Sequence, residues 1–183
     1  HDSFSLANVA PQVGSGFNRD YWARLEKWTR DLTAECDAVH VVTGVLFLPA
    51  KRASRSATDE SAASSPCDAE DDDGRAATTY VMGHAAIGTP PALVQVPTHF
   101  WKVIVAETAG QGFAVGAFVM PNAPVAADAP LSGFVVGLEA LEAAAGVILL
   151  PKLLTAQNRA ALAAAEAPWL PAVASESLAL PAG

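Results

Sequence analysis

Three polar side chains of different chemistry recur along one short stretch of the chain, FNRDYWARLEKWTR at residues 17–30. They are the amide of Asn18, the carboxylate of Glu26 and the guanidinium of Arg30. Amide and carboxylate oxygens suit a hard cation such as Mg²⁺, which prefers oxygen ligands and keeps several of its waters. A guanidinium binds phosphate oxygens through a planar fork of N–H donors. These residue types together favour metal-assisted hydrolysis of a phosphate ester.

The same three residues also fit ordinary structural roles on a helix. Asn18 stands where an N-cap is expected, with Asp20 in the first turn. Glu26 and Arg30 have the i, i+4 spacing of a common helix salt bridge. Taken alone, the spacing favours a helix cap and a salt bridge over a catalytic role for these three residues. Other segments of the chain are needed to distinguish the two interpretations.

The pattern of apolar residues predicts an amphipathic helix over residues 17–35, which would position this row. One helical stripe is formed by residues at i, i+4, i+7 and i+11, namely Tyr21, Leu25, Trp28 and Leu32. With an advance of about 100° per residue, Asn18, Trp22, Glu26 and Arg30 fall in a slowly drifting row beside that stripe. Trp22 could stack on a nucleic-acid base, but its place next to the stripe favours packing in the core.

The remaining segments predict an α+β domain with a central, mainly antiparallel sheet flanked by helices. A buried strand is expected at 39–48, and further strands at 78–83, 85–88 and 112–121. Residues 92–107 read as a pair of strands or one strand bent at Pro97. Residues 132–146 begin extended and end as a short helix with Gly146 as its C-cap, 147–151 are a short strand or buried run, and 156–167 form an Ala-rich helix.

Composition and charge divide the chain into a folded domain and two segments of another kind. Hydrophobic residues make up 51% of the 183 residues, which suits one domain with a full core. Residues 51–78 carry seven acidic and four basic residues but almost no large apolar ones, so we expect a disordered acidic insertion there. The domain is expected to span residues 1–168, followed by a C-terminal tail at 169–183.

Several classes of protein fit the sequence poorly. The formal net charge of −8 disfavours a broad phosphate-binding surface, although it leaves room for a small basic site. Cys36 and Cys67 are too few for a disulfide framework or a zinc site, and free thiols in a reducing compartment are expected. The sequence contains no run of about 18 consecutive apolar residues, so no membrane-spanning helix is predicted. The chain begins with His1, from which we expect a processed or trimmed N-terminus.

A family resemblance changes the balance between the two interpretations of the helix. SLANVAPQ at residues 5–12 followed by FNRDYWARLEKWTR resembles the ββα-metal family of DNA/RNA non-specific nucleases, and the endonuclease G group within it. Further segments agree in order: VVTGVLFLP (41–49), VPTHFWKV (96–103), FVMPNAP (118–124) and GVILLP (146–151). Several colinear segments are far more specific than one short motif. The resemblance spans roughly residues 3–155, apart from the acidic insertion.

The resemblance implies a role for each matching position. Asn18 matches the asparagine that is the single direct protein ligand of a hydrated Mg²⁺, with Mn²⁺ as the alternative ion. Glu26 matches the acid that orients the water shell of the metal, and Arg30 matches an arginine that contacts phosphate. Asn8 matches an asparagine that supports the active site by hydrogen bonding. DNA and RNA as substrates, a homodimer and a mitochondrial location are likewise implied by the resemblance alone.

One part of the family pattern is missing from residues 1–183. The general base of the family is the histidine of an Asp-Arg-Gly-His motif, which precedes the segment that contains Asn8, and no such motif occurs here. His1 is no substitute, because its neighbours match residues after the motif. We therefore expect the general base, and the first strands of the fold, to lie upstream. The alternatives are an inactive fragment or pseudonuclease that binds nucleic acid or protein, and an unrelated α+β binding domain.

The other polar residues of the matched strands favour structural roles. His40 and His99 are expected to be histidines of the core or the sheet edge, and His84 receives no role. Lys102 is expected to form a salt bridge inside the fold.

Overall fold

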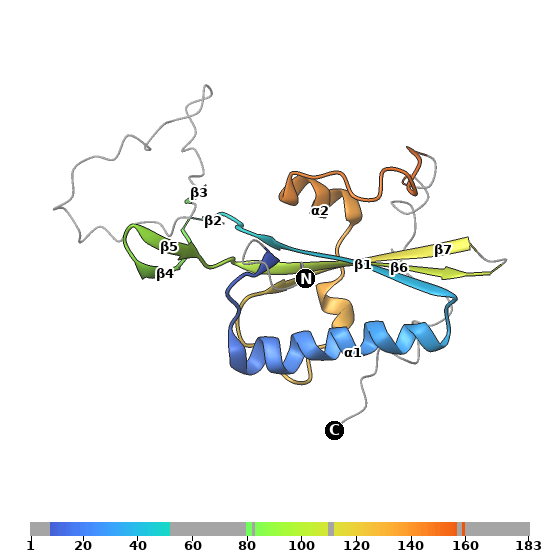
Figure 1. The fold of residues 1–183 in the computed structure, drawn as a ribbon, viewed down its shortest axis with the longest axis horizontal. Coiled ribbons are helices and arrows are strands. Elements are labelled where there is room, and N and C mark those ends of the chain that lie inside the picture. Colours follow the sequence, from blue (N-terminus) through green and yellow to red (C-terminus); the bar gives the residue numbers. More distant parts are fainter. Residues whose placement is uncertain (1–7, 52–79, 82, 110–111, 157–158, 160–183) are drawn as a thin grey trace.

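The residues that the structure describes form a three-stranded antiparallel sheet with one α-helix on each face (Figure 1). The structure is a computed structural model that describes residues 8–51, 80–81, 83–109, 112–156 and 159. The sheet has the order β1-β6-β7, formed by β1 (Ala38–Leu46), β6 (His99–Thr108) and β7 (Gly112–Pro121). The helix α1 (Ala23–Asp31) lies on one face and α2 (Leu138–Ala145) on the other. This arrangement confirms the predicted α+β class with a mainly antiparallel sheet.

The predicted helix at 17–35 is present as three consecutive helical pieces. A helical segment of π type, Gly14–Trp22, leads into α1, and a 3-10 turn at Leu32–Ala34 ends it. The first piece is broken by a kink, since Ser15 and Gly16 have non-helical backbone angles. The apolar stripe is buried as its spacing predicts, with Tyr21, Leu25, Trp28 and Leu32 all in the core.

The helix begins by a different device from the predicted Asn18 cap. Gly16 has φ +78°, a left-handed conformation that favours glycine. Its N–H donates to the Asp20 carboxylate at 2.5 Å, and its carbonyl accepts from Val125 N at 3.0 Å. Within the described residues the Asn18 side chain makes no capping hydrogen bond, and its backbone N–H donates to Val13 O at 3.0 Å, so Asn18 lies inside the helical segment rather than at its cap. The N-cap prediction is therefore wrong, and Asp20 supplies the carboxylate that holds the first turn.

The strand at 39–48 was expected to be buried, but β1 lies at the edge of the described sheet. Among the described strands it pairs with β6 alone, in a register that places Thr43 opposite Lys102. Three of its side chains, His40, Val41 and Thr43, are exposed. The apolar run predicted the strand correctly, but β-branched residues on an edge strand look the same in sequence as those of a buried one.

The remaining described strands form two short antiparallel pairs. The pairs are β2 (Ala50–Lys51) with β3 (Tyr80–Val81), and β4 (Ala86–Thr89) with β5 (Ala92–Gln95). The chain then passes Pro97 and enters β6, which confirms the interpretation of 92–107 as a pair of strands. In Figure 1 the β4–β5 hairpin projects from one end of the sheet.

The segment after β7 differs in part from its prediction. Residues Leu131–Phe134 form a 3-10 turn rather than an extended start, and Val135 makes an isolated bridge to Phe118. The helix α2 ends at Gly146, whose φ of +68° confirms the predicted C-cap. Residues 147–151 form no strand, although Leu149 is buried. None of the helices within the described ranges is long and apolar enough to cross a membrane.

Three predicted segments fall largely outside the described residues. They are the acidic insertion at 51–78, of which only Lys51 at the end of β2 is described, the Ala-rich helix at 156–167 and the tail at 169–183. The division into a domain at 1–168 and a tail stays a prediction.

The two faces of the sheet bury separate apolar clusters. The cluster on the α1 side joins Phe17, Tyr21, Trp22, Leu25, Trp28 and Leu32 to Phe100, Ile104, Phe118, Met120 and Leu131. The cluster on the α2 side is built around Trp101, Val103, Val105, Val115, Leu141, Leu149 and Leu154. Alternate residues of β6 therefore point to opposite faces, so Phe100, Lys102 and Ile104 belong to the side that faces α1.

Gly44 in β1 gives a direct test of the sheet register. It pairs with Trp101, and a Cβ at Gly44 would lie 2.4 Å from Trp101 Cζ2. We expect Gly44→Ala to lower the free energy of unfolding by about 2 kcal/mol, because the buried indole has to move. Gly133→Ala is the matched control, since nothing lies within 4 Å of a Cβ there. Urea unfolding measures both, and equal small effects would contradict the register.

Candidate active site

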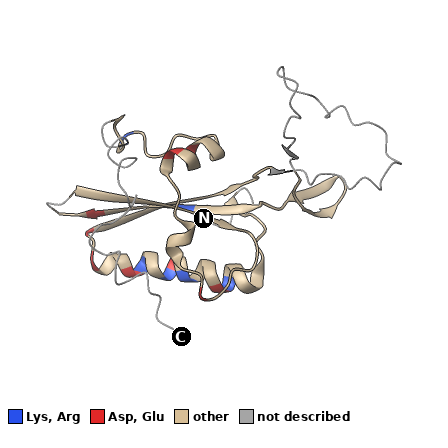
Figure 2. Cartoon of the chain, turned by 180° about the vertical axis from the view of Figure 1, so that it is seen from behind, with Lys and Arg blue, Asp and Glu red and all other residues tan. Residues whose placement is uncertain are grey.

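The predicted row lies along the edge of the helix that begins at Phe17. Asn18 and Glu26 are half-buried, Arg30 is exposed, and Trp22 between them is buried. Figure 2 shows Lys, Arg, Asp and Glu gathered along this helix, while the sheet is mostly uncharged. Basic residues of the helix are Arg19, Arg24, Lys27 and Arg30. The acids Asp20, Glu26 and Asp31 alternate with these bases, so the helix carries charges of both signs beside the predicted site.

The amide side chain of Asn18 is not used by the described fold. It forms no hydrogen bond with any residue that the structure describes, and the helix cap is supplied by Asp20 instead. Its oxygen is the kind of neutral, hard donor that Mg²⁺ accepts. No three His, Cys, Asp or Glu side chains gather within the described ranges, but Mg²⁺ commonly takes only one or two protein oxygens and keeps its waters. The donor set therefore fits a hydrated magnesium ion.

Glu26 and Arg30 do not form the salt bridge that their spacing allows. Within the described ranges the ion pairs are Lys27–Asp31 at 2.6 Å, His40–Glu107 at 3.5 Å and Arg159–Glu142 at 2.6 Å. The Glu26 carboxylate and the Arg30 guanidinium thus form no ion pair within the described residues.

Arg30 also differs from the other basic residues of the helix. Arg19 donates to Ser15 Oγ at 2.7 Å, Arg24 donates to the carbonyl of Ala127, and Lys27 pairs with Asp31. The exposed guanidinium of Arg30 makes no side-chain hydrogen bond or ion pair in the part of the chain that is described. Its five N–H donors are therefore available to an anion.

Trp22 packs in the core, which confirms the structural interpretation over base stacking. Only 4% of it is exposed. Its ring lies 5.7 Å from that of Phe17 and 5.8 Å from that of Phe100, measured between centroids. Lys102 Nζ stands 4.7 Å from the centroid of the indole, so one face of the ring is already covered.

Lys102 is the residue near this row whose contacts differ most from their prediction. It was expected to form a salt bridge, but its Nζ donates to Thr43 Oγ1 at 3.1 Å and lies over Trp22. Burial lowers the pKa of Lys102 below its usual value, and the Glu26 carboxylate acts in the opposite direction. The signal in the sequence was a lone lysine within the apolar run HFWKVIVA, at a position whose alternation faces the core.

Asn122, which follows β7, ties the start of the helix to the sheet. Its Oδ1 accepts from Val13 N at 2.8 Å, and its Nδ2 donates to Pro11 O at 3.1 Å and Pro97 O at 2.9 Å. One side chain thereby joins three segments and holds the chain just before Asn18. Asn122 stands in the FVMPNAP segment, but nothing in its sequence context predicted this role.

Replacement of Asn122 by alanine tests this tie. The change removes three hydrogen bonds and leaves half-buried backbone groups at Val13, Pro11 and Pro97 without this partner. We expect the free energy of unfolding to fall by about 3 kcal/mol, since an unsatisfied buried polar group costs about 1–3 kcal/mol. Chemical denaturation measures the effect, and a loss below about 1 kcal/mol would mean that the loop holds its place without Asn122.

The other predicted polar residues lie away from the row or contribute no contact to it. Asn8 is exposed near the beginning of the described chain, and no hydrogen bond of the described residues joins it to Asn18, Glu26 or Arg30. His40 is an edge residue beside Glu107, and His84 lies 4.9 Å from the Phe47 ring. His99 Nδ1 is 3.0 Å from Thr98 Oγ1, and burial lowers the pKa of His99.

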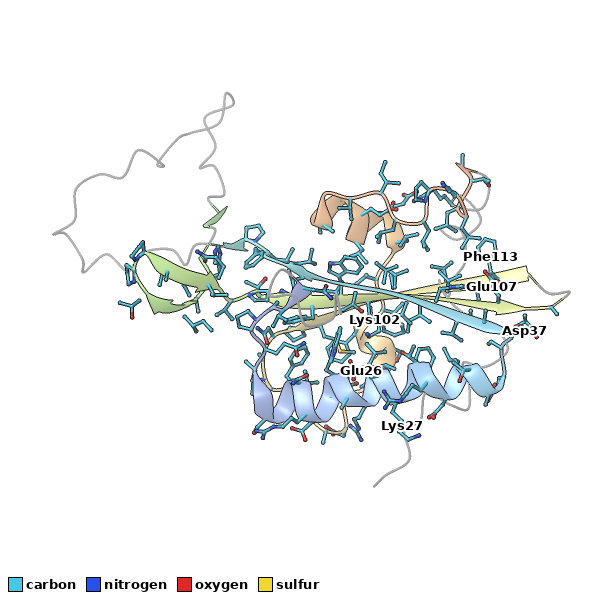
Figure 3. All side chains as sticks on the ribbon, in the orientation of Figure 1. Glu26, Lys27, Asp37, Lys102, Glu107 and Phe113 are labelled. Atoms are coloured by element: carbon cyan, nitrogen blue, oxygen red, sulfur yellow. The ribbon has the colours of Figure 1, made fainter. Side chains whose placement is uncertain are left out.

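A cavity lies at the other end of the sheet from Asn18, where β1 begins. Its volume is about 350 Å³, and its lining includes Asp37, Glu107 and Phe113 (Figure 3). None of the predicted site residues lines it. The candidate site is thus an open helix edge rather than this hollow.

Comparison with known proteins identifies the family. The family model described as DNA/RNA non-specific endonuclease matches residues 1–156. A "Nuclease" of Syncephalastrum racemosum is 43% identical over 152 residues, which cover 83% of this chain and 42% of that protein. The "Mitochondrial nuclease" of Saccharomyces cerevisiae is 40% identical, with 87% of this chain and 43% of that protein covered. Human "Endonuclease G, mitochondrial" is 38% identical, with 84% and 43% covered.

A solved structure agrees with these sequence matches. A chain from the crystal structure of the EndoG/EndoGI complex superposes with a TM-score of 0.63 at 38% identity. The match covers 81% of this chain and 50% of that one, so the chain spans about half the length of the relatives it matches. The superposition is consistent with the ββα-metal nuclease fold. With a family match over residues 1–156, the chain belongs to the DNA/RNA non-specific endonuclease family.

Proposed function

We propose that the protein is a Mg²⁺-dependent endonuclease that hydrolyses phosphodiester bonds of DNA and RNA with little sequence preference. One observation carries the proposal beyond family membership. Asn18, Glu26 and Arg30 share one helix edge, and their side chains neither cap that helix nor pair with one another. Residues retained only for helix stability would be expected to make those contacts.

Each residue of the row has a distinct task in this proposal. Asn18 binds Mg²⁺ through its amide oxygen, with Mn²⁺ as the alternative ion, and Glu26 orients the water shell of the metal. A bound Mg²⁺ would polarise the phosphate and stabilise the leaving oxygen. Arg30 contacts the phosphate and neutralises charge that develops during the reaction. The family pattern implies that Asn8 supports the site by hydrogen bonding, although no hydrogen bond within the described residues joins it to Asn18, Glu26 or Arg30.

The proton-accepting group is assigned to a segment outside residues 1–183. In the family pattern that group is the histidine of an Asp-Arg-Gly-His motif, which would deprotonate the attacking water. Residues 1–183 would then supply the metal side of the active site. Contacts to the sugar-phosphate backbone position a nucleic acid without reading its bases, so weak sequence preference is expected.

Plasmid cleavage tests the proposal. The complete polypeptide that contains residues 1–183 is expected to nick supercoiled plasmid and degrade RNA when Mg²⁺ is present, and to stop when EDTA is added. Residues 1–183 alone are expected to bind the metal but to cleave very slowly without the general base. A complete polypeptide that stays inert with both Mg²⁺ and Mn²⁺ would contradict the proposal and favour a pseudonuclease.

We further propose a mitochondrial location and a homodimeric state. The location is supported by relatives from Saccharomyces cerevisiae and human whose names call them mitochondrial, and the homodimer by family resemblance. A fluorescent fusion of the complete polypeptide should colocalise with a mitochondrial dye, and light scattering should give twice the mass of one chain. A monomer in solution would contradict the second proposal and leave the first unchanged.

A further inference from the structure

Lys102 places a positive charge inside the molecule, beneath the proposed active-site row. It lies in the middle of β6 on the face toward α1, and only 6% of it is exposed. Its neighbours on that face of β6, Phe100 and Ile104, belong to the apolar cluster. Moving an ammonium out of water costs free energy unless nearby groups compensate. An apolar residue would fill this position without that cost. Stability alone therefore does not explain a lysine here.

Three neighbours compensate the charge of Lys102, and none of them is a direct ion pair. An ammonium carries three N–H donors. One of them donates to Thr43 Oγ1 at 3.1 Å, from the residue directly opposite on β1. The Trp22 ring, 4.7 Å from Nζ, adds a cation–π contact. The carboxylate that balances the charge is Glu26, which attracts Lys102 electrostatically but forms no ion pair with it among the described contacts.

The side chains of Lys102 and Glu26 approach from opposite sides of the same gap. Figure 3 shows Lys102 directed from β6 toward α1, with Glu26 on the side of α1 that is nearer the sheet. Lys27, the next residue along the helix, points away from the sheet. Trp22, whose ring makes the cation–π contact with Lys102, lies one helical turn after Asn18 and one turn before Glu26. The ammonium of Lys102 therefore lies next to the part of the row between Asn18 and Glu26.

This placement suits an acid that has to hold water molecules. A carboxylate that accepts hydrogen bonds from metal-bound waters needs both its oxygens available and its charge retained. A direct bidentate partner such as Arg30 would occupy those oxygens. A cation that attracts the carboxylate without bonding to it can orient the carboxylate and leaves both of its oxygens open.

We propose that Lys102 is a positioning residue for Glu26: its buried ammonium, held by Thr43 and Trp22, attracts the Glu26 carboxylate and directs it toward the metal's waters. The inference rests on the proposed function, in which Glu26 orients that water shell. Lys102 itself touches neither metal nor substrate in this account. Its contribution is made through Glu26 alone, and this predicts a specific coupling between the two residues.

A double-mutant cycle measures that coupling. Lys102→Met, Glu26→Gln and the double variant are made in the complete polypeptide, and kcat and KM are determined with Mg²⁺ on a defined duplex. Lys102→Met is expected to lower kcat about tenfold, as loss of an outer-shell partner of a metal site typically does, with KM changed less than about twofold. In the Glu26→Gln background the same change is expected to have no further effect on kcat.

Lys27→Met is the matched control. It removes the same charge from an exposed position adjacent to Glu26, where Lys27 pairs with Asp31. Its kcat is expected to equal that of the parent protein. If Lys27→Met lowers kcat as much as Lys102→Met does, the effect is one of general charge and the inference is overturned.

The remaining outcomes separate this inference from the proposed function. An unchanged kcat in Lys102→Met, or an equal loss in both backgrounds, would overturn the role of Lys102 while Glu26→Gln still reports on Glu26. Full activity of Glu26→Gln would instead remove the assigned role of Glu26 itself. Lys102→Met should fold, because an apolar replacement of a buried charge is often neutral or stabilising, and thermal unfolding checks this. If it does not fold, Thr43→Val takes its place in the cycle, with a threefold loss of kcat expected only when Glu26 is present.

Discussion

The Asn18→Ala variant of the complete polypeptide is expected to hydrolyse plasmid DNA on the order of 10³ times more slowly than the parent protein. Metal ions stabilise such transition states by several kcal/mol, and each 1.4 kcal/mol corresponds to about a factor of ten in rate. The stability of the fold should barely change, since the half-buried Asn18 side chain makes no hydrogen bond to another described residue. Initial rates over a range of Mg²⁺ concentrations measure the loss.

Arg19→Ala is the control for this variant. Arg19 is the next residue, is exposed, and donates to Ser15 in the turn before the helix. Its removal should leave the rate within about twofold of the parent, because surface substitutions away from special features have small effects. A fully active Asn18→Ala protein would show that the amide does not hold the catalytic metal.

The second large effect is expected at Arg30. Arg30→Met should lower kcat/KM about a hundredfold, because the guanidinium would no longer neutralise charge on the phosphate. The logarithm of kcat/KM should also depend less steeply on the logarithm of salt concentration, with a slope reduced by about one phosphate contact. Steady-state kinetics on duplex DNA at several salt concentrations provide both quantities.

Arg24→Met distinguishes a specific contact from a general loss of positive charge. Arg24 is on the same helix, but its guanidinium donates to the Ala127 carbonyl and lies 5.8 Å from the Tyr21 ring. It should therefore keep a near-parental kcat/KM and salt slope. If the two arginine variants behave alike, the helix contributes only a diffuse field and Arg30 has no particular role.

The spacing of apolar residues predicted the helix and strands that carry the site. It predicted less well where the helix begins and how exposed the edge strand is. The stripe from Tyr21 to Leu32 predicted a helix whose buried face is now seen in the core. The start of that helix depends instead on the positive φ of Gly16 and on the Asp20 carboxylate. Asn18 was a reasonable cap by residue type, but the backbone conformation of Gly16 is not visible in a pattern of apolar residues.

The contacts that hold the site in place join residues far apart in the chain. Asn122 reaches back to Val13, and Lys102 on β6 meets Thr43 on β1 and Trp22 on the helix. Hydrophobic alternation predicted the strands on which these residues lie, but not which polar side chain would face which partner. The i, i+4 spacing of Glu26 and Arg30 likewise predicted a pair that did not form, because Glu26 lies toward Lys102 and the sheet.

Metal binding is the measurement that tests the central claim most directly, because it needs neither the general base nor catalysis. Mn²⁺ can be titrated into the ¹⁵N-labelled complete polypeptide while paramagnetic broadening of its NMR signals is followed. The account predicts that the side-chain amide of Asn18 and the backbone amides of its turn broaden first, and that Asn18→Ala abolishes this effect. Broadening that persists unchanged in Asn18→Ala, or that appears only in the acidic segment 59–73, would contradict it.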